Sequence, residues 1–124
     1  MELIIGGAYQ GKLTYAIGKY GLTPGDACDL SNGIPHGEFR CCYHLEALTR
    51  SAAAEGVSAD ELMDRLMPLM NCDAVISREV GSGVVPMEPE NRLFRELHGE
   101  VLRRFAREAD SVTRIFCGIP ETLK

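Results

Sequence analysis

An apolar run at the start of the chain, residues 3–5, leads directly into the spacing G-x-x-x-x-G-K from Gly6 to Lys12. This pattern predicts a phosphate-binding loop between a buried strand and a helix, because glycines permit a tight turn and a close approach to an anion. Backbone N–H groups at the start of the helix would face that anion, and Lys12 would reach the outer phosphates of a nucleotide. The candidate nucleotide-binding residues of this stretch are Gly6, Gly7, Ala8, Tyr9, Gln10, Gly11, Lys12, Leu13 and Thr14.

The residue after the lysine departs from the usual form of this motif. A Ser or Thr hydroxyl normally holds Mg²⁺ there, but this chain has Leu13, and Thr14 comes one place later. Because one residue along a helix turns a side chain by roughly 100°, Thr14 is an imperfect substitute as a metal ligand. Asp29, at the end of a short expected strand, is our candidate metal-associated carboxylate, and Glu79 is the alternative. A glycine turn that binds no ligand is the alternative explanation of the whole motif.

A second strand that leads into glycines occurs later in the chain. Residues 73–77 have the apolar character of a buried strand, and Gly81 and Gly83 follow it. In an open parallel sheet, ligands lie beyond the carboxyl ends of the strands. We therefore expect Gly81 and Gly83 to line the same crevice as the first loop, with a flexible turn that contacts no ligand as the alternative.

The chain alternates segments with strand and helix patterns, which implies an α/β fold with a parallel sheet and right-handed crossovers. A polar connection at residues 25–39 interrupts the alternation, and such a long connection is usually functional or mobile. The expected strands are residues 2–5, 27–30, 73–77 and 111–117. The expected helices are residues 12–20, 39–55, a segment capped by Ser58 and bent at Pro68, and residues 90–109.

Composition narrows the classes of function. The chain has 124 residues, a formal charge of −5 and a pI near 5.2, so we expect a single domain over residues 1–124 and no nucleic-acid partner, since that would require a basic face. An acidic chain with a local anion site suits a small phosphorylated ligand. No apolar run approaches the roughly 20 residues of a membrane span, and we expect a cytoplasmic protein.

The five cysteines are an odd number without C-x-x-C spacing, so a disulfide framework is not expected. A zinc site built from Cys41, Cys42, His36 and His44 is disfavoured, because adjacent cysteines point in divergent directions on regular elements.

Several motifs together resemble those of one family, the bifunctional adenosylcobinamide kinases and adenosylcobinamide-phosphate guanylyltransferases of cobalamin biosynthesis. The likeness covers residues 2–19 and 73–124, and its C-terminal part is the more specific. The motifs are I-I-G-G-A-x-x-G-K at the start, V-I-S-x-E-V-G-S-G-V-V-P at residues 75–86, F-R-E-L-x-G at 94–99, A-D-S-V at 109–112 and G-I-P-x-x-L-K at 118–124.

The resemblance implies a P-loop NTPase-like three-layer sandwich with a small, mostly parallel sheet. It also implies ATP or GTP bound with Mg²⁺ at residues 6–12, phosphorylation of a cobinamide hydroxyl, and transfer of GMP from GTP through a guanylylated histidine. Members of the family form ring-like trimers, so the resemblance implies a homo-oligomer.

The chain departs from the family at the positions that matter for catalysis. Besides Leu13, Arg78 replaces the usual Asn, and the chain is shorter where the family carries its guanylylated histidine. His36 is the candidate for that nucleophile, whereas we expect His44 to pack or cap within a helix and His98 to lie on a helix surface or its margin. The candidate catalytic residues are therefore Lys12, His36, Asp29 and Glu79.

Three functions follow from these observations. The first is an active transferase in which the kinase reaction dominates, because phosphoryl transfer requires no covalent histidine. The second is a nucleotide-binding module without catalysis, which Leu13 and the missing histidine segment favour. The third is a structural subunit that keeps only the fold and its oligomer interface, which the retained glycines and Lys12 disfavour.

Overall fold

The computed structural model describes residues 1–79 and 88–124. Its strands form one sheet in the order β2-β3-β4-β1-β5-β6, in which β6 alone runs antiparallel to its neighbour. The strands are β1 (Glu2–Gly6), β2 (Ala27–Asp29), β3 (Cys41–Tyr43), β4 (Ala74–Arg78), β5 (Ser111–Phe116) and β6 (Ile119–Thr122). The helices are α1 (Lys12–Tyr20), α2 (Leu45–Glu55), α3 (Ala59–Leu66) and α4 (Pro89–Glu108), with short 3₁₀ turns at η1 (Pro24–Asp26), η2 (Leu30–Asn32) and η3 (Met67–Asn71).

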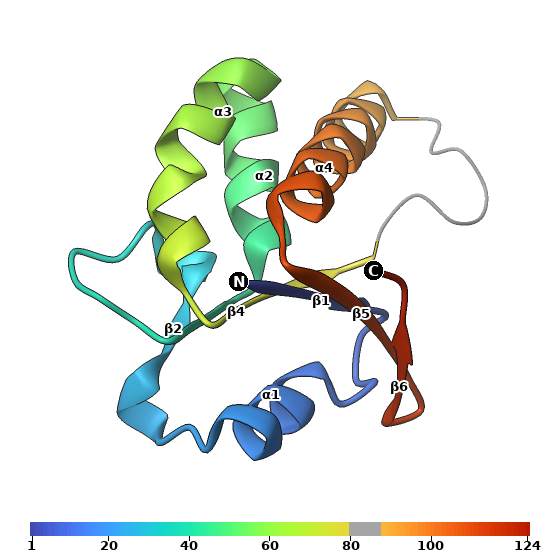
Figure 1. The fold of residues 1–124 in the computed structure, drawn as a ribbon. Helices are drawn as coiled ribbons and strands as arrows, with labels where there is room; N and C mark the ends of the chain where they lie inside the picture. Colours follow the sequence, from blue (N-terminus) through green and yellow to red (C-terminus); the bar gives the residue numbers. More distant parts are fainter. Residues whose placement is uncertain (80–87) are drawn as a thin grey trace.

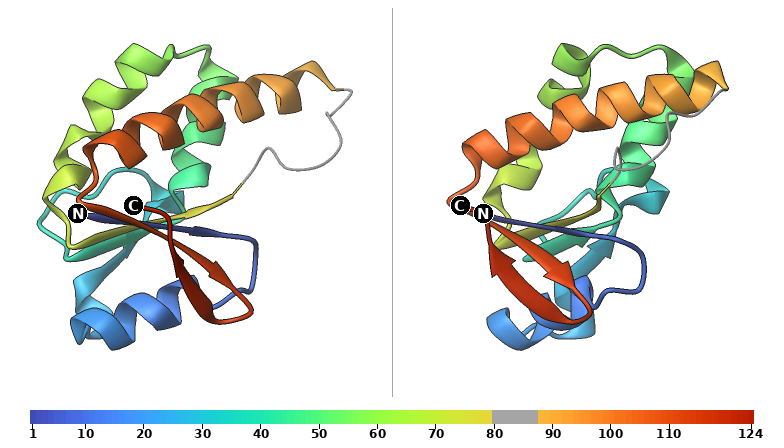
Figure 2. Two further views of the ribbon diagram at one scale, coloured as in Figure 1. Left: turned by 45° about the vertical axis from the view of Figure 1, so that its right-hand side comes forward. Right: turned by 90° about the vertical axis from the view of Figure 1, so that its right-hand side faces the viewer.

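The elements form three layers. Helices α2, α3 and α4 cover one face of the sheet and α1 covers the other, as the views in Figure 1 and Figure 2 show. The expected α/β fold with a small, mostly parallel sheet is confirmed.

The two central strands are buried on both faces, which is why they read as continuous apolar runs. Side chains alternate between the faces of a strand. Leu3 and Val75 accordingly pack with Val101 and Phe105 of α4, while Ile4 and neighbouring side chains pack under α1. This core fixes the carboxyl ends of β1 and β4, where the glycine loop begins.

The predicted helix over residues 39–55 is wrong in its first part. Residues 41–43 form strand β3, and the helix begins only at Leu45. Cys41 and Cys42 are both buried but belong to core clusters on opposite faces of the sheet, as strand residues must. A short apolar run cannot be assigned to helix or strand by its pattern alone, and pairing with β2 and β4 decides this one.

A buried carboxylate ties α1 to the sheet. The Glu2 side chain is 2% exposed and accepts hydrogen bonds from Tyr20 Oη at 2.6 Å, Lys19 Nζ at 3.0 Å, Tyr15 Oη at 3.2 Å and Thr113 Oγ1. Burial raises the pKa of this carboxyl, but the hydrogen bonds outweigh that effect and hold the pKa below its ordinary value. The network holds the helix that carries the end of the glycine loop.

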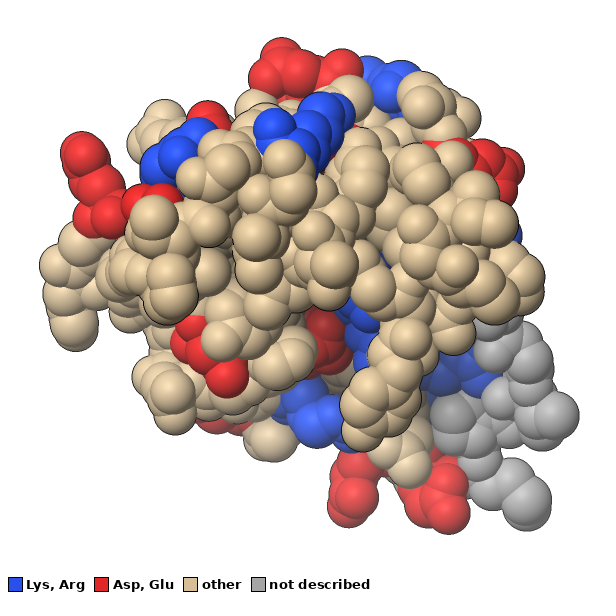
Figure 3. Space-filling view, turned by 90° about the horizontal axis from the view of Figure 1, so that it is seen from below, with Lys and Arg blue, Asp and Glu red and all other residues tan. Residues whose placement is uncertain are grey.

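The surface on the α1 side carries both signs of charge. Figure 3 shows Lys and Arg side chains interspersed with Asp and Glu among uncharged residues on this face. Among the described residues, no helix is long and apolar enough to cross a membrane.

His98 is fully buried, so the expectation that it lies on the surface or margin of its helix is wrong. Its Nε2 lies 2.8 Å from Ser77 Oγ and 3.3 Å from the Arg78 carbonyl oxygen, and its Nδ1 lies 2.9 Å from Thr49 Oγ1. The ring also stacks on Phe94. The imidazole therefore joins α4, α2 and the end of β4, an environment that helical periodicity does not reveal.

Burial of His98 predicts a loss of stability in mild acid. Burial lowers the pKa of this imidazole from its ordinary value of 6.5, although the Arg78 carbonyl and Glu46 oppose the shift. Below about pH 6.5 the unfolded chain therefore binds a proton that the folded chain resists. The free energy of unfolding should fall by up to about 1.4 kcal/mol between about pH 7.5 and about pH 5.5.

Urea unfolding of the wild type and of His98→Gln at both pH values checks this expectation. The variant cannot take up the proton, so the difference in unfolding free energy between the two proteins should shrink in acid. A difference that stays constant with pH would show that His98 does not titrate in this way. Carboxyls with lowered pKa values, such as Glu2, lose their contribution only at more acidic pH.

Candidate functional site

The glycine loop joins the end of β1 to the start of α1, at the carboxyl edge of the parallel strands (Figure 1). Lys12 is the first residue of α1, and its Nζ donates a 2.6 Å hydrogen bond to the carbonyl oxygen of Gly7. Burial lowers the pKa of the Lys12 amine from its ordinary value of 10.5; Glu46 opposes this shift and the positive charge of Arg78 adds to it. The ammonium group of Lys12 therefore lies over the backbone of the glycine loop.

Two glycines of the motif are required for different reasons. A Cβ on Gly6 would stand 2.6 Å from the Ile115 carbonyl oxygen, so the close approach of β1 and β5 excludes a side chain. Gly11 has a φ of 92°, in the left-handed region that favours glycine. Tyr9, at the apex of the loop, has a φ of 60° and a fully exposed ring.

Neighbouring segments hold the loop in place. The N–H of Gly118, in the turn between β5 and β6, donates to the Gln10 carbonyl oxygen at 2.9 Å, and the N–H of Cys117 donates to Gln10 Oε1 at 2.5 Å. The N–H of Glu79 donates to the Gly6 carbonyl oxygen at 2.8 Å. The loop is therefore fixed from both sides by backbone groups distant in sequence.

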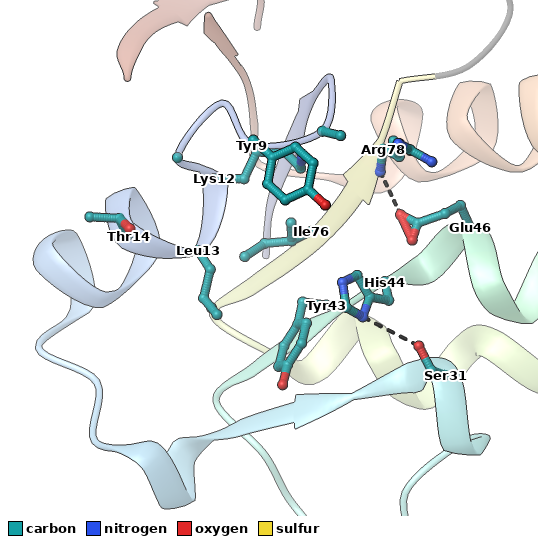
Figure 4. A pocket seen from close by; sticks show the side chains of 12 residues that line it. Tyr9, Lys12, Leu13, Thr14, Ser31, Tyr43, His44, Glu46, Ile76 and Arg78 are labelled. Carbon is teal, nitrogen blue, oxygen red and sulfur yellow. Dashed lines mark hydrogen bonds between the residues drawn. The ribbon is translucent and has the colours of Figure 1, made fainter. Parts of the chain in front are cut away.

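A cavity of about 570 Å³ opens beside the loop, toward β3 and α2. This volume lies in the range of small-molecule sites. Figure 4 shows Tyr9 and Lys12 on one side of the cavity and His44, Glu46 and Arg78 on the other. The lining residues are Ala8, Tyr9, Gly11, Lys12, Leu13, Thr14, Ser31, Tyr43, His44, Glu46, Ile76 and Arg78.

Asp29, Ser31 and His44 form a hydrogen-bonded group at one wall. His44 Nδ1 lies 2.8 Å from Asp29 Oδ1 and 3.3 Å from Ser31 Oγ, and the Ser31 N–H donates to Asp29 Oδ1 at 2.9 Å. Burial raises the pKa of the Asp29 carboxyl, but the hydrogen bonds from Ser31 and His44 outweigh it and hold the pKa below its ordinary value of 3.8. Asp29 is therefore an anion that faces a histidine.

Glu46 and Arg78 bring opposite charges to the far end of the cavity. Glu46 lies in the first turn of α2, and its Oε1 accepts the backbone N–H of Arg78 at 2.7 Å. The carboxylate thus fixes the last residue of β4. This contact links the start of α2 to the carboxyl edge of the sheet.

Leu13 and Thr14 both line the cavity but differ in their surroundings. Leu13 is partly buried and packs with the cluster under α1, and Figure 4 shows its side chain toward Tyr43. Thr14 is exposed and lies farther from Tyr43 on the same helix (Figure 4). An apolar side chain therefore occupies the position where a hydroxyl usually holds Mg²⁺.

Of the four predicted catalytic residues, Lys12 lines this cavity and Asp29, Glu79 and His36 do not. Asp29 contacts two residues of the wall, Ser31 and His44. Glu79 forms an ion pair with Arg114, with Oε2 and Nε 3.0 Å apart. His36 is exposed in the connection between η2 and β3. Its neighbours Pro35 and Gly37 line a second cavity with Asp73, at the amino end of β4, so the structure does not bring His36 to Lys12. Gly81 and Gly83 lie outside the described residues.

Sequence reasoning missed the residues that close the cavity opposite the loop. These residues are Ser31, Tyr43, His44, Glu46 and Arg78. For His44 the sequence predicts packing or capping. The one local signal is the polar pair at positions 44 and 46, which follows the short run Cys41–Tyr43 and is typical of a strand end. The predicted helix over residues 39–55 concealed it.

Comparison with known proteins gives two matches. Residues 44–123 match the model of the family described as cobinamide kinase / cobinamide phosphate guanyltransferase. The chain is also similar to the bifunctional adenosylcobalamin biosynthesis protein CobU of Salmonella typhimurium, with 34% identity over 76 residues. That stretch is 59% of this chain and 42% of the relative, so the alignment spans less than half the length of the curated protein.

The family match includes part of the wall opposite the glycine loop and none of the loop itself. It begins at His44 and contains Glu46 and Arg78, whereas the glycine loop lies before it. The assignment of the loop therefore depends on its own geometry, and that geometry places Lys12 against the matched segment.

Proposed function

The chain belongs to the cobinamide kinase / cobinamide phosphate guanyltransferase family, and on this premise we propose that it is a nucleotide-binding transferase of cobalamin biosynthesis. In this proposal it moves the terminal phosphoryl group of ATP or GTP to a hydroxyl of a cobinamide. The observation that carries the proposal is Lys12, folded over a glycine loop and facing a 570 Å³ cavity. Phosphoryl transfer requires positioning and neutralisation of charge and no covalent histidine.

The two sides of the cavity suit the two substrates. The loop and Lys12 would receive the triphosphate, which leaves the wall of Tyr43, His44 and Glu46 for the acceptor hydroxyl. Tyr43 with Leu13 and Ile76 gives that side an apolar surface, as a bulky organic acceptor requires. We also propose a homo-oligomer, which the family resemblance implies.

The residues present fit Mg²⁺ only weakly. Leu13 cannot coordinate a hard cation, and Asp29 is already engaged by His44 and Ser31. Among residues 1–79 and 88–124, no group of three or more His, Cys, Asp or Glu side chains is arranged to hold a metal ion. When bound, Mg²⁺ would neutralise phosphate charge, and Thr14 and Glu46, which line the cavity, are candidate oxygen ligands.

We therefore expect nucleotide affinity to depend on Mg²⁺ less than in an ordinary P-loop protein. Leu13→Ser should restore part of the dependence by supplying the missing hydroxyl, and Leu13→Ala is the matched control that removes the apolar side chain without adding one. Calorimetric titration with GTP, with and without Mg²⁺, measures the effect. Much tighter binding of MgGTP than of free GTP by the wild type would contradict the expectation.

A nucleotide-binding module without catalysis is the second candidate function. Leu13 at the usual metal-ligand position favours it. Titration with ATP and GTP, followed by incubation with cobinamide and detection of cobinamide phosphate, separates the candidates. Binding together with transfer supports the transferase, binding alone supports the module, and neither supports a structural subunit.

A further inference from the structure

His44 has a backbone conformation that a packing or capping role does not explain. It is the residue before α2 and has a φ of 65°, in the left-handed region that a non-glycine residue enters at a cost of about 1–3 kcal/mol. Its side chain makes no capping hydrogen bond to the helix. The strained backbone instead directs the imidazole to the cavity wall, where it is 52% exposed.

The orientation of the ring is determined by Asp29. Because Asp29 is ionised and accepts from Nδ1 at 2.8 Å, the proton of a neutral imidazole belongs on Nδ1. The lone pair is then on Nε2. Among the described residues Nε2 has no hydrogen-bond partner, and Figure 4 shows that side of the ring turned toward the cavity. The Tyr43 ring packs edge-on against the imidazole, with the two ring centroids 4.8 Å apart, and limits its rotation.

The position of His44 relative to Lys12 suggests which phosphate it faces. In a phosphate-binding loop the backbone cradles the inner phosphates and the lysine reaches the outer ones. His44 lies across the cavity from Lys12 (Figure 4), so its Nε2 faces the side where the terminal phosphoryl group and its acceptor would meet. The other charged groups of this wall are Glu46 from α2 and Arg78 from β4.

We propose that His44 is the general base of the transfer and that Asp29 is its positioning residue, an inference that rests on the proposed function. The acceptor oxygen forms a bond to the terminal phosphorus while its proton moves to Nε2 of His44. The bond from that phosphorus to the bridging oxygen breaks, and its electron pair leaves with the nucleoside diphosphate. Asp29 stabilises the imidazolium that forms, as an ionised carboxylate beside Nδ1–H does.

The decisive variant is His44→Asn. Asparagine tolerates the left-handed region, and its amide N–H can replace Nδ1–H as the donor to Asp29, so this variant keeps the fold and removes only the base. We expect kcat for phosphorylation of cobinamide to fall by about 10²–10⁴-fold, with the Kd for ATP or GTP changed less than about twofold. Glu38→Gln, in the exposed loop at the opposite edge of the sheet, serves as the control and should leave kcat unchanged.

Asp29→Asn tests the positioning role separately. Its amide can donate to Nδ1 and favour the tautomer with the proton on Nε2, so kcat should fall at least about tenfold while nucleotide binding persists. Nitrogen-15 NMR of the imidazole should show Nδ1–H in the wild type and Nε2–H in this variant. Nε2–H in the wild type, or full activity of His44→Asn, would overturn the assignment of His44 alone. A wild type that binds nucleotide without transfer would instead overturn the proposed function.

Discussion

Replacement of Lys12 with alanine is expected to weaken the binding of ATP or GTP by about 10- to 150-fold. This corresponds to about 1.5–3 kcal/mol, the range for hydrogen bonds to charged groups. Lys12 Nζ donates to the Gly7 carbonyl oxygen at 2.6 Å, so a phosphate need only replace one acceptor beside the loop. The backbone N–H groups remain in the variant, and for this reason we expect weakened rather than abolished binding. Isothermal titration calorimetry measures the change directly.

Lys124→Ala is the matched control for this experiment. Its Nζ donates to the carbonyl oxygens of Ala106 and Arg107 in the last turn of α4, both at 3.0 Å, and of Ala109 just after the helix, at 2.6 Å. Lys124 does not line the cavity. It should leave nucleotide affinity unchanged while it lowers stability slightly. Undetectable binding by the wild type, or equal affinity in Lys12→Ala, would remove the phosphate-binding loop from the proposal.

The glycine loop could be predicted from the sequence because the residues of its motif are close together in the chain. The buried strand, the two glycines and the lysine lie within residues 2–12, and the start of α1 follows from the same stretch. Even here the reasons differ from position to position. Gly11 is required by its own backbone conformation, whereas Gly6 is required by Ile115, a residue more than a hundred positions away, which no local pattern shows.

The opposite wall of the cavity could not be predicted, because it depends on the register of non-adjacent strands. His44 and Glu46 face the loop only because β3 pairs with β4 and β4 with β1. The sequence pattern around Cys41 and Cys42 fits a helix as well as a strand. Because we predict a helix there, His44 and Glu46 are not recognised as residues that follow a strand end. The contact between Asp29 and His44 also joins residues that are fifteen positions apart. The sequence does not show this contact, and it therefore predicts a metal ligand at Asp29.

The final expectation concerns guanylylation, which would separate a bifunctional transferase from a kinase. A histidine nucleophile must attack the α-phosphorus of GTP and release pyrophosphate, so it must stand beside the inner phosphate. His36 is exposed, and the residues on either side of it line a cavity at the amino end of β4. His98 is buried, and both of its ring nitrogens have hydrogen-bond partners. His44 lies across the cavity from Lys12, so in the proposed binding mode it would face the outer phosphates.

We therefore predict that the protein forms no stable GMP adduct. Incubation with Mg²⁺ and GTP labelled at the α-phosphate, followed by denaturing electrophoresis, tests this. A phosphoramidate would appear as a labelled band that is lost in acid. CobU from Salmonella typhimurium, incubated with the same labelled GTP and run on the same gel, shows whether the assay conditions permit detection of an adduct.

If a labelled band appears, single histidine variants identify the residue that carries the GMP. A labelled band that His36→Ala abolishes and His44→Ala does not would make His36 the nucleophile, and the connection between η2 and β3 would then have to move to the glycine loop. A band that only His44→Ala abolishes would make His44 a nucleophile at the inner phosphate and overturn its role as a base. Asp29 already contacts Nδ1, and in the proposed binding mode Nε2 would face the outer phosphates. We therefore expect neither band and expect cobinamide phosphate to form without a covalent intermediate.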